Sequence, residues 1–204
     1  MSGETVLVPG ARRVETALDV PDDATDTDAC AVACPPHPRR GGHRGDARLL
    51  AVSDALTARG IACLRIDYGD WDGGYGERED ARNALRWATE RYERVGCIGY
   101  SFGAAIAALA AASVEVSLRA VALLAPTRLA ADGLDVVTAV RDIDVPLYVV
   151  YGERDTTADW RPAVAAARDA GATVTALATG HAVAGSTDVA AASIGSFLAA
   201  ELRG

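Results

Sequence analysis

Residues 94–107 decide the fold, and they read RVGCIGYSFGAAIA. The first half is rich in Val, Ile and Gly and is typical of a buried strand, whereas the Ala-rich second half favours a helix. Ser101 stands between them. Its neighbours two positions away on either side, Gly99 and Gly103, are small enough to let the strand and the helix approach each other. The segment therefore predicts a strand, a tight turn with an exposed serine hydroxyl, and a helix.

Such a turn has a chemical use. The start of the helix offers backbone N–H groups and a positive dipole end to an oxyanion, and Phe102 is the natural first donor. A bare Gly-x-Ser-x-Gly pattern arises by chance about 0.1 times in a sequence of this length and composition. Its place between a strand and a helix makes it more specific, although an ordinary Gly-rich turn is the alternative.

The rest of the chain continues this alternation of strands and helices. The expected strands are 5–8, 13–20, 29–34, 61–66, 94–99, 119–124, 146–151 and 173–177, and the expected helices are 46–59, 78–92, 102–112, 134–141, 160–170 and 187–202. The first two strands have no helix between them, which predicts an antiparallel hairpin at one edge. We expect an α/β fold in one domain, residues 1–204, with a doubly wound, mostly parallel eight-stranded sheet and helices on both faces.

A nucleophilic serine needs a base and an acid that orients the base. His181 is the only histidine beyond Ser101, and it lies between the last expected strand and the last expected helix. Asp155 follows the strand 146–151, at the carboxyl end where ligand sites of open α/β sheets lie. Three other acids compete with Asp155 for the role, namely Asp132, Asp135 and Asp159.

In the order Ser101, Asp155, His181, these residues make the chain resemble the α/β-hydrolase superfamily, and within it the small members without a large cap that are similar to dienelactone hydrolases and related esterases. The resemblance covers nearly the whole chain. It implies a serine hydrolase that acts on small carboxylic esters by acyl transfer through a Ser-His-Asp triad. Thioester or lactone hydrolysis by the same residues, and a non-catalytic binding protein of this fold, are the alternatives. Dienelactone hydrolases proper carry Cys at the turn, so the serine here indicates more general ester chemistry.

The same resemblance gives a reading of residues 34–42, CPPHPRRGG. They are similar to the His-Pro-His-Pro-x-x-Gly-Gly loop of some small relatives, with Pro35 in place of the first His. In the family this loop donates the second oxyanion N–H. By position the donor is His37, because Pro36 and Pro38 have no N–H to give.

Other loops offer candidates for the substrate pocket. Tyr68 and Trp71 lie in the segment 66–75, which is rich in aromatic and acidic residues, and they are either substrate-binding residues or rings that cover the edge of the core. Three arginines could steer a carboxylate-bearing substrate or could be solvated, namely Arg39, Arg40 and Arg44. Only about 20 residues separate the strand that ends near 124 from the strand at 146, so no large cap is expected.

The composition limits which binding partners are expected. The formal net charge is −8, and all 20 basic residues are Arg. An acidic surface repels nucleic acid and anionic lipid, so neither is expected to bind, and the absence of Lys excludes a P-loop lysine and a pyridoxal Schiff base. A GC-rich genome with an acidic proteome and adaptation to high salt are equally good explanations of the acidity. The expected partner is a small-molecule ester, and the expected assembly is a monomer or a homodimer.

No cofactor is expected. Residues 96–99 do not match Gly-x-Gly-x-x-Gly, which argues against a dinucleotide site. Two cysteines and two histidines have spacings faintly like a zinc site, but ligands packed this closely at a strand end would disrupt the sheet; they are Cys30, Cys34, His37 and His43. All four cysteines, including Cys63 and Cys97, lie in apolar runs where reduced thiols are expected.

Without a signal peptide or a long apolar run in the sequence, a cytoplasmic location is expected.

Overall fold

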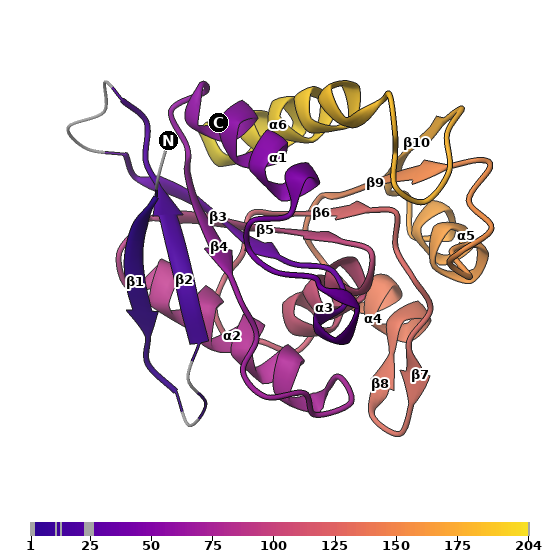
Figure 1. Ribbon diagram of the computed structural model, residues 1–204, viewed down its shortest axis with the longest axis horizontal. Helices are drawn as coiled ribbons and strands as arrows, with labels where there is room; N and C mark the ends of the chain where they lie inside the picture. The colour runs from indigo at the N-terminus through magenta and orange to yellow at the C-terminus, as the bar shows by residue number, and fades with distance from the viewer. Residues whose placement is uncertain (1–2, 11, 13, 23–26, 204) are drawn as a thin grey trace.

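Eight strands form one sheet in the order β1-β2-β4-β3-β5-β6-β9-β10 (Figure 1). The computed structural model describes residues 3–10, 12, 14–22 and 27–203. The strands are β1 (Glu4–Val8), β2 (Val14–Asp19), β3 (Ala29–Cys34), β4 (Ala62–Ile66), β5 (Arg94–Tyr100), β6 (Ala120–Leu124), β9 (Leu147–Gly152) and β10 (Thr173–Leu177). The expected edge hairpin is confirmed, because β1 pairs antiparallel with β2. Across the sheet from β4 to β10, every pair of neighbouring strands is parallel, so the carboxyl ends of these strands meet at one edge. Residue 13, the first of the expected strand 13–20, lies outside the described residues.

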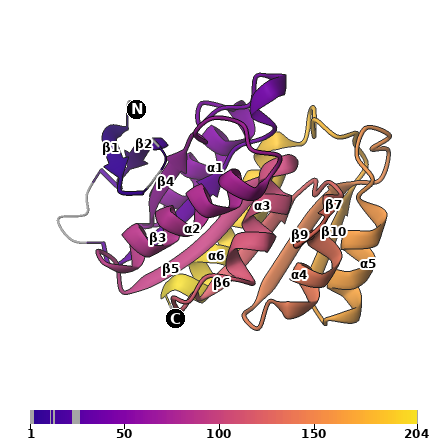
Figure 2. The same cartoon turned by 90° about the horizontal axis from the view of Figure 1, so that it is seen from below.

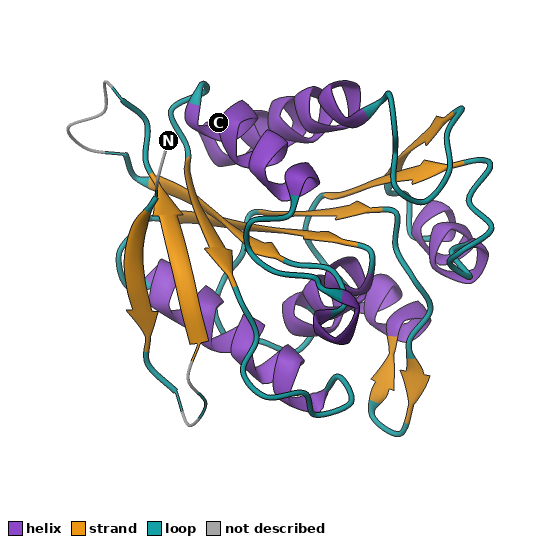
Figure 3. Cartoon of the chain, in the orientation of Figure 1, coloured by secondary structure: helices purple, strands orange, loops and turns teal. Residues whose placement is uncertain are grey.

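Helices cover both faces of the sheet, as expected (Figures 1 and 3). They are α1 (Ala47–Thr57), α2 (Tyr75–Thr89), α3 (Phe102–Ala111), α4 (Val136–Asp142), α5 (Arg161–Asp169) and α6 (Thr187–Arg203). Helices α1 and α6 pack together on one face, and α2 to α5 form a row on the other, which Figure 2 shows from below. The core is accordingly split into two apolar layers, one on each side of the sheet.

Helix α3 lies at the centre of its row, and its first nine residues are all buried. Six of the ten residues in α3 are Ala, and Ala costs the least in helix formation. Small side chains also let the helix approach the sheet and both neighbouring helices closely, and α3 contacts α2, α4 and β5. The composition that predicted this helix from sequence thus also explains why it can be enclosed.

Two expected helices differ in their starts. Helix α2 begins at residue 75 instead of 78, because the Glu77 carboxylate accepts the N–H groups of Asp72 and Gly74 and so caps the helix earlier. The expected helix 134–141 was wrong in its first two residues. Those residues form β8 (Leu134–Asp135), which pairs with β7 (Ala130–Ala131) in a small hairpin.

The segment between β6 and β9 holds only this hairpin and the short helix α4, so no large cap covers the sheet edge. The four cysteines are free and buried. In the described part of the chain, no helix combines the length and the apolar character needed to cross a bilayer.

Candidate active site

The serine turn has the backbone that its sequence predicted. Ser101 joins β5 to α3 with φ 59° and ψ −118°, a conformation that L-residues rarely adopt. Its N–H donates to the Leu124 carbonyl of the neighbouring strand at 2.9 Å. A Cβ atom added to Gly99 would collide with the Gly103 carbonyl, and one added to Gly103 would collide with carbonyls at the end of β3. Both glycines are therefore required by close backbone approach.

A continuous hydrogen-bonded chain joins the three residues that the sequence placed in order. Ser101 Oγ lies 2.7 Å from His181 Nε2, and His181 Nδ1 lies 2.6 Å from Asp155 Oδ2. The His181 side chain is 16% exposed, whereas that of Asp155 is only 1% exposed. The serine and histidine thus face a cleft, and the carboxylate lies behind them.

Asp155 is held by its own loop. Its Oδ1 atom accepts the N–H groups of Thr157 at 2.8 Å and Ala158 at 3.1 Å, so both carboxylate oxygens are satisfied. The indole N–H of Trp160 donates to the Asp155 carbonyl at 3.1 Å, a contact that sequence reasoning did not foresee. Burial and these donors make Asp155 a fixed acceptor for the histidine.

The competing acids have other partners. Asp159 forms an ion pair with Arg128, and Asp135 caps the start of α4 through the Val137 N–H. Asp132 lies in the turn between β7 and β8, where its carbonyl accepts a tyrosine hydroxyl. Of the four candidate acids, the one that contacts His181 is Asp155.

The histidine loop is positioned by close packing. A Cβ atom on Gly152 would lie 2.5 Å from the Thr179 carbonyl, which shows how tightly the end of β9 meets this loop. The Tyr100 hydroxyl donates to the His181 carbonyl at 3.2 Å. Three non-glycine residues in the described part of the chain have left-handed φ values, namely Ser101, Ala125 and Val183. All follow strands at the edge that carries the site, where backbone strain often accompanies function.

The side chains of the two residues expected to supply the oxyanion donors pack against each other. The rings of His37 and Phe102 have centroids 4.8 Å apart, and neither backbone N–H has an acceptor among the described residues. His37 caps a short 3₁₀ helix, η1 (Pro38–Arg40), and its Nδ1 accepts the Arg39 N–H. Partial burial and the nearby Arg40 guanidinium lower the pKa of His37, which favours the neutral ring that can accept this hydrogen bond.

A cleft of about 660 Å³ brings most of these groups together. Ser101, His181, His37, Phe102 and Trp71 all line it. Trp71 is 37% exposed and stacks on His37 with centroids 4.5 Å apart. The sequence missed several further lining residues, namely Arg48, Thr127, Arg128, Leu129, Thr157 and Ala158. Arg48 lies in the first turn of α1, and the others lie in loops after two different strands, so no local pattern groups them.

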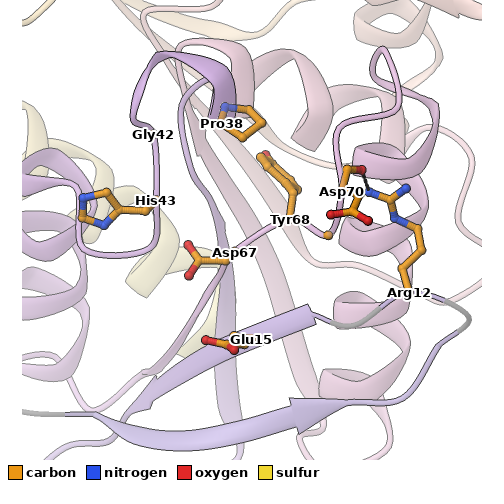
Figure 4. Close-up of a pocket in the computed structure, with 9 residues that line it drawn as sticks. Arg12, Glu15, Pro38, Gly42, His43, Asp67, Tyr68 and Asp70 are labelled. Carbon is orange, nitrogen blue, oxygen red and sulfur yellow. Dashed lines mark hydrogen bonds between the residues drawn. The ribbon is translucent and has the colours of Figure 1, made fainter.

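Tyr68 is not brought into this cleft. It lines a second pocket, of about 700 Å³, which we call the rear pocket (Figure 4). Of the three arginines considered from sequence, Arg40 lines the cleft, and Arg44 pairs instead with Asp67 beside the rear pocket. Among the described residues, no group of three or more His, Cys, Asp or Glu side chains is arranged to hold a metal ion.

Comparison with known proteins identifies the family of the chain. The model of the dienelactone hydrolase family matches residues 71–175, which is half of the chain. The chain belongs to the dienelactone hydrolase family. It is therefore a hydrolase that acts on ester bonds, and the family resemblance expected from the sequence is confirmed. No curated protein sequence matches the chain.

Several solved structures share the fold of this dienelactone hydrolase family member over nearly its whole length. Est1E from Butyrivibrio proteoclasticus superposes with a TM-score of 0.86 at 17% identity, with 100% of both chains covered. A serine hydrolase without a lid from Xanthomonas campestris gives 0.77 at 21% identity, covering 100% of this chain and 94% of that one. The Pyrococcus furiosus esterase gives 0.79 at 15%, covering 98% and 91%. At these identities the likeness establishes the fold, an α/β-hydrolase fold without a large cap.

Proposed function

We propose that this protein hydrolyses small carboxylic esters by acyl transfer through Ser101, His181 and Asp155. The observation that carries the proposal is the unbroken chain of two short hydrogen bonds from the buried carboxylate to the serine hydroxyl at the floor of the cleft. A serine, a histidine base and an orienting acid in this arrangement are what nucleophilic catalysis requires.

In the first step, Ser101 Oγ attacks the ester carbonyl carbon while His181 Nε2 takes its proton. Asp155 accepts a hydrogen bond from the Nδ1–H group, which holds the ring in the correct tautomer and stabilises the imidazolium that forms. The backbone N–H groups of Phe102 and His37 stabilise the oxyanion, and His181 then gives its proton to the leaving alcohol. Water, activated by the same histidine, attacks the acyl-enzyme and releases the acid.

The charge of the cleft favours anionic esters. Arg40, Arg48 and Arg128 line it, against a single acidic lining residue, Asp46, although the whole chain carries a net charge of −8. Asp46 is already paired with Arg48. Arg40 is exposed and has no ion pair among the described residues. Of two esters of equal size, we expect the one that carries a carboxylate to have the higher kcat/KM, by about tenfold at low salt.

Lactones are esters closed into a ring, so the same residues would hydrolyse them by the same steps. Est1E has been solved with ferulic acid bound, and an aromatic acyl group would meet Trp71 and Phe102 in this cleft. A panel of alkyl, aryl and lactone substrates ranks these possibilities directly.

Reaction with a fluorophosphonate probe tests the proposed nucleophile. The folded parent should be labelled, and Ser101→Ala should not. Asp155→Asn should lower kcat by about 10⁴-fold, because the histidine would be held in the wrong tautomer. The matched control is Asp159→Asn, which changes an exposed acid four residues away and should leave kcat within a few-fold. Labelling that persists in Ser101→Ala, or is absent from the folded parent, contradicts the proposal.

A further inference from the structure

Tyr68 contacts both segments that carry the proposed oxyanion donors. It follows β4, whose carboxyl end lies beside that of β3 in the sheet. Its hydroxyl donates to the Pro35 carbonyl at 3.1 Å, two residues before His37. Its ring meets Phe102 edge-on, with centroids 6.0 Å apart and an angle of 88° between the planes. One side chain therefore touches the backbone before one donor and the ring of the other.

The loop that carries His37 has few other ties to the sheet. Prolines occupy three of the four positions 35–38, and proline has no N–H to donate. The His37 carbonyl accepts N–H groups only from later residues of the same loop. Within the described residues, the Tyr68 hydroxyl is the one donor to the Pro35 carbonyl. The loop is thus stiff within itself but is held at its start by a single side-chain hydrogen bond.

The rear pocket makes that hydrogen bond more important for the position of the loop. Pro38 and Gly42 of the loop line it together with Tyr68, as Figure 4 shows, and Gly42 also lines the cleft. The loop therefore lies between two hollows. Close-packed atoms on both sides normally hold a segment in place, and a hollow removes those contacts on one side. Ring contacts of His37 with Trp71 and Phe102 also hold the loop, but the Tyr68 hydroxyl supplies the side-chain hydrogen bond at its start.

The hydroxyl can donate only while it is protonated. Burial raises the pKa of Tyr68 well above its ordinary value, and the neighbouring thiols of Cys34 and Cys97 act in the same direction. The bond to Pro35 is therefore present throughout the pH range in which esters are assayed.

We propose that Tyr68 is a positioning residue for the oxyanion hole, whose hydroxyl sets the backbone before His37 and whose ring sets Phe102. The inference rests on the proposed function, because the oxyanion donors that Tyr68 would position act only if Ser101 attacks an ester. The oxyanion forms during the attack and not in the bound substrate, so loss of positioning should weaken the transition state more than substrate binding.

Tyr68→Phe tests the hydroxyl, because it removes the hydrogen bond and keeps the ring. For p-nitrophenyl acetate we expect kcat to fall about tenfold, less than the loss on removal of a whole donor, with KM unchanged within about twofold. Affinity for a trifluoromethyl ketone, whose adduct with serine carries an oxyanion, should fall by the same factor as kcat. Tyr68→Leu, which also removes the ring contact, should lower both values further.

Tyr75→Phe is the matched control. It removes another tyrosine hydroxyl that donates to a backbone carbonyl, that of Asp132, outside the cleft. We expect it to leave kcat and ketone affinity at the parent values. Thermal unfolding of each variant reports whether it is folded.

The outcomes separate the two proposals. A folded Tyr68→Phe variant with parental kcat and ketone affinity overturns the positioning role, and so does a rise in KM alone, while fluorophosphonate labelling of the parent leaves the proposed function standing. A parent that neither reacts with the probe nor hydrolyses the ester overturns both. A fall in kcat that ketone affinity does not follow also contradicts the inference, because the defect would then lie outside the oxyanion hole.

Discussion

The serine turn and the loop that carries His37 face the same cleft, but they are held in different ways. The turn is determined by residues within two positions of Ser101, because Gly99 and Gly103 permit the approach that forces the backbone to φ 59°. The loop has no such local code, and it is held by side chains that follow or belong to β4. A site can therefore combine one part encoded locally with another that exists only after distant strands pair.

The contacts that hold the loop are polar, and the side chains that make them differ in how deeply they are buried. Arg65, in β4, is 5% exposed, pairs with Asp19 and donates to the Arg44 carbonyl at 2.6 Å. Asp67 accepts the Arg44 N–H at 2.6 Å at a more exposed position. With Tyr68 at the start of the loop, these residues fix both of its ends. The following predictions separate the two kinds of control, from the largest expected effect to the smallest.

Gly103→Ala should damage both parts at once. The new Cβ atom would collide with the carbonyls of Cys34 and Pro35, and backbone cannot give way cheaply. Because misplacement by about 1 Å costs about 100-fold in rate, we expect kcat/KM to fall by at least that factor. Overpacking should lower the free energy of unfolding by about 1–3 kcal/mol.

Gly171→Ala is its control, measured by urea unfolding and ester hydrolysis. Gly171 has φ 78° and open space around it, so an alanine there meets backbone strain without a collision. It should lose about 1 kcal/mol of stability and keep its activity. Equal activity in the two variants would show that close approach at Gly103 does not set the serine turn.

Arg65→Met should act mainly on stability. It leaves the buried Asp19 carboxylate without its partner, and breaking a buried ion pair costs about 3 kcal/mol. Urea unfolding measures the loss, and kcat/KM should fall by less than in Gly103→Ala because Tyr68 still holds the start of the loop. Arg94→Met breaks a surface pair with Asp28 and should leave the unfolding midpoint close to that of the parent. If the fall in kcat, expressed as a free energy, exceeds the loss in the free energy of unfolding, Arg65 is the principal residue that holds the loop.

Asp67→Asn should have a smaller effect. Asparagine keeps an oxygen for the Arg44 N–H but loses the charge that pairs with the guanidinium. We expect a loss of about 1 kcal/mol in the free energy of unfolding and a decrease in kcat of less than about threefold. The loss of stability should shrink in high salt if it is electrostatic, and a salt-independent loss would point to altered packing instead.

His37→Asn should reduce how strongly stability depends on pH. The pKa of His37 is lowered in the folded protein, first by burial and then by Arg40, so the unfolded chain takes up a proton first as the pH falls. Stability from this group is complete above its ordinary pKa of 6.5 and is lost as the pH falls through the lower folded value. Asparagine keeps a capping oxygen and does not titrate. Unfolding midpoints between pH 8 and pH 5 should therefore decline less in the variant, and parallel declines would remove His37 as a cause.

Several elements were predictable because their signals are local. All eight strands of the sheet and the edge hairpin follow from apolar runs and their spacing, and strand ends differ by at most one residue. The two-residue strands β7 and β8 and the short helix η1 are too brief to leave a periodic pattern. The early start of α2 depends on the Glu77 carboxylate reaching back to the loop before it, which helical periodicity does not reveal.

The sequence by itself determined the serine turn, because the glycines two positions before and after Ser101 permit the close approach of strand and helix that larger residues would block. It also determined the chain order in which Asp155 and His181 follow, and the structure brings all three side chains into contact, although their catalytic roles remain a prediction. Only the tertiary structure decided what Tyr68 does. Its contacts depend on β4 lying beside β3 in the sheet, and strand order is set by long-range pairing that no local pattern records. That pairing places the Tyr68 hydroxyl on the Pro35 carbonyl, away from the substrate cleft where the sequence had suggested it.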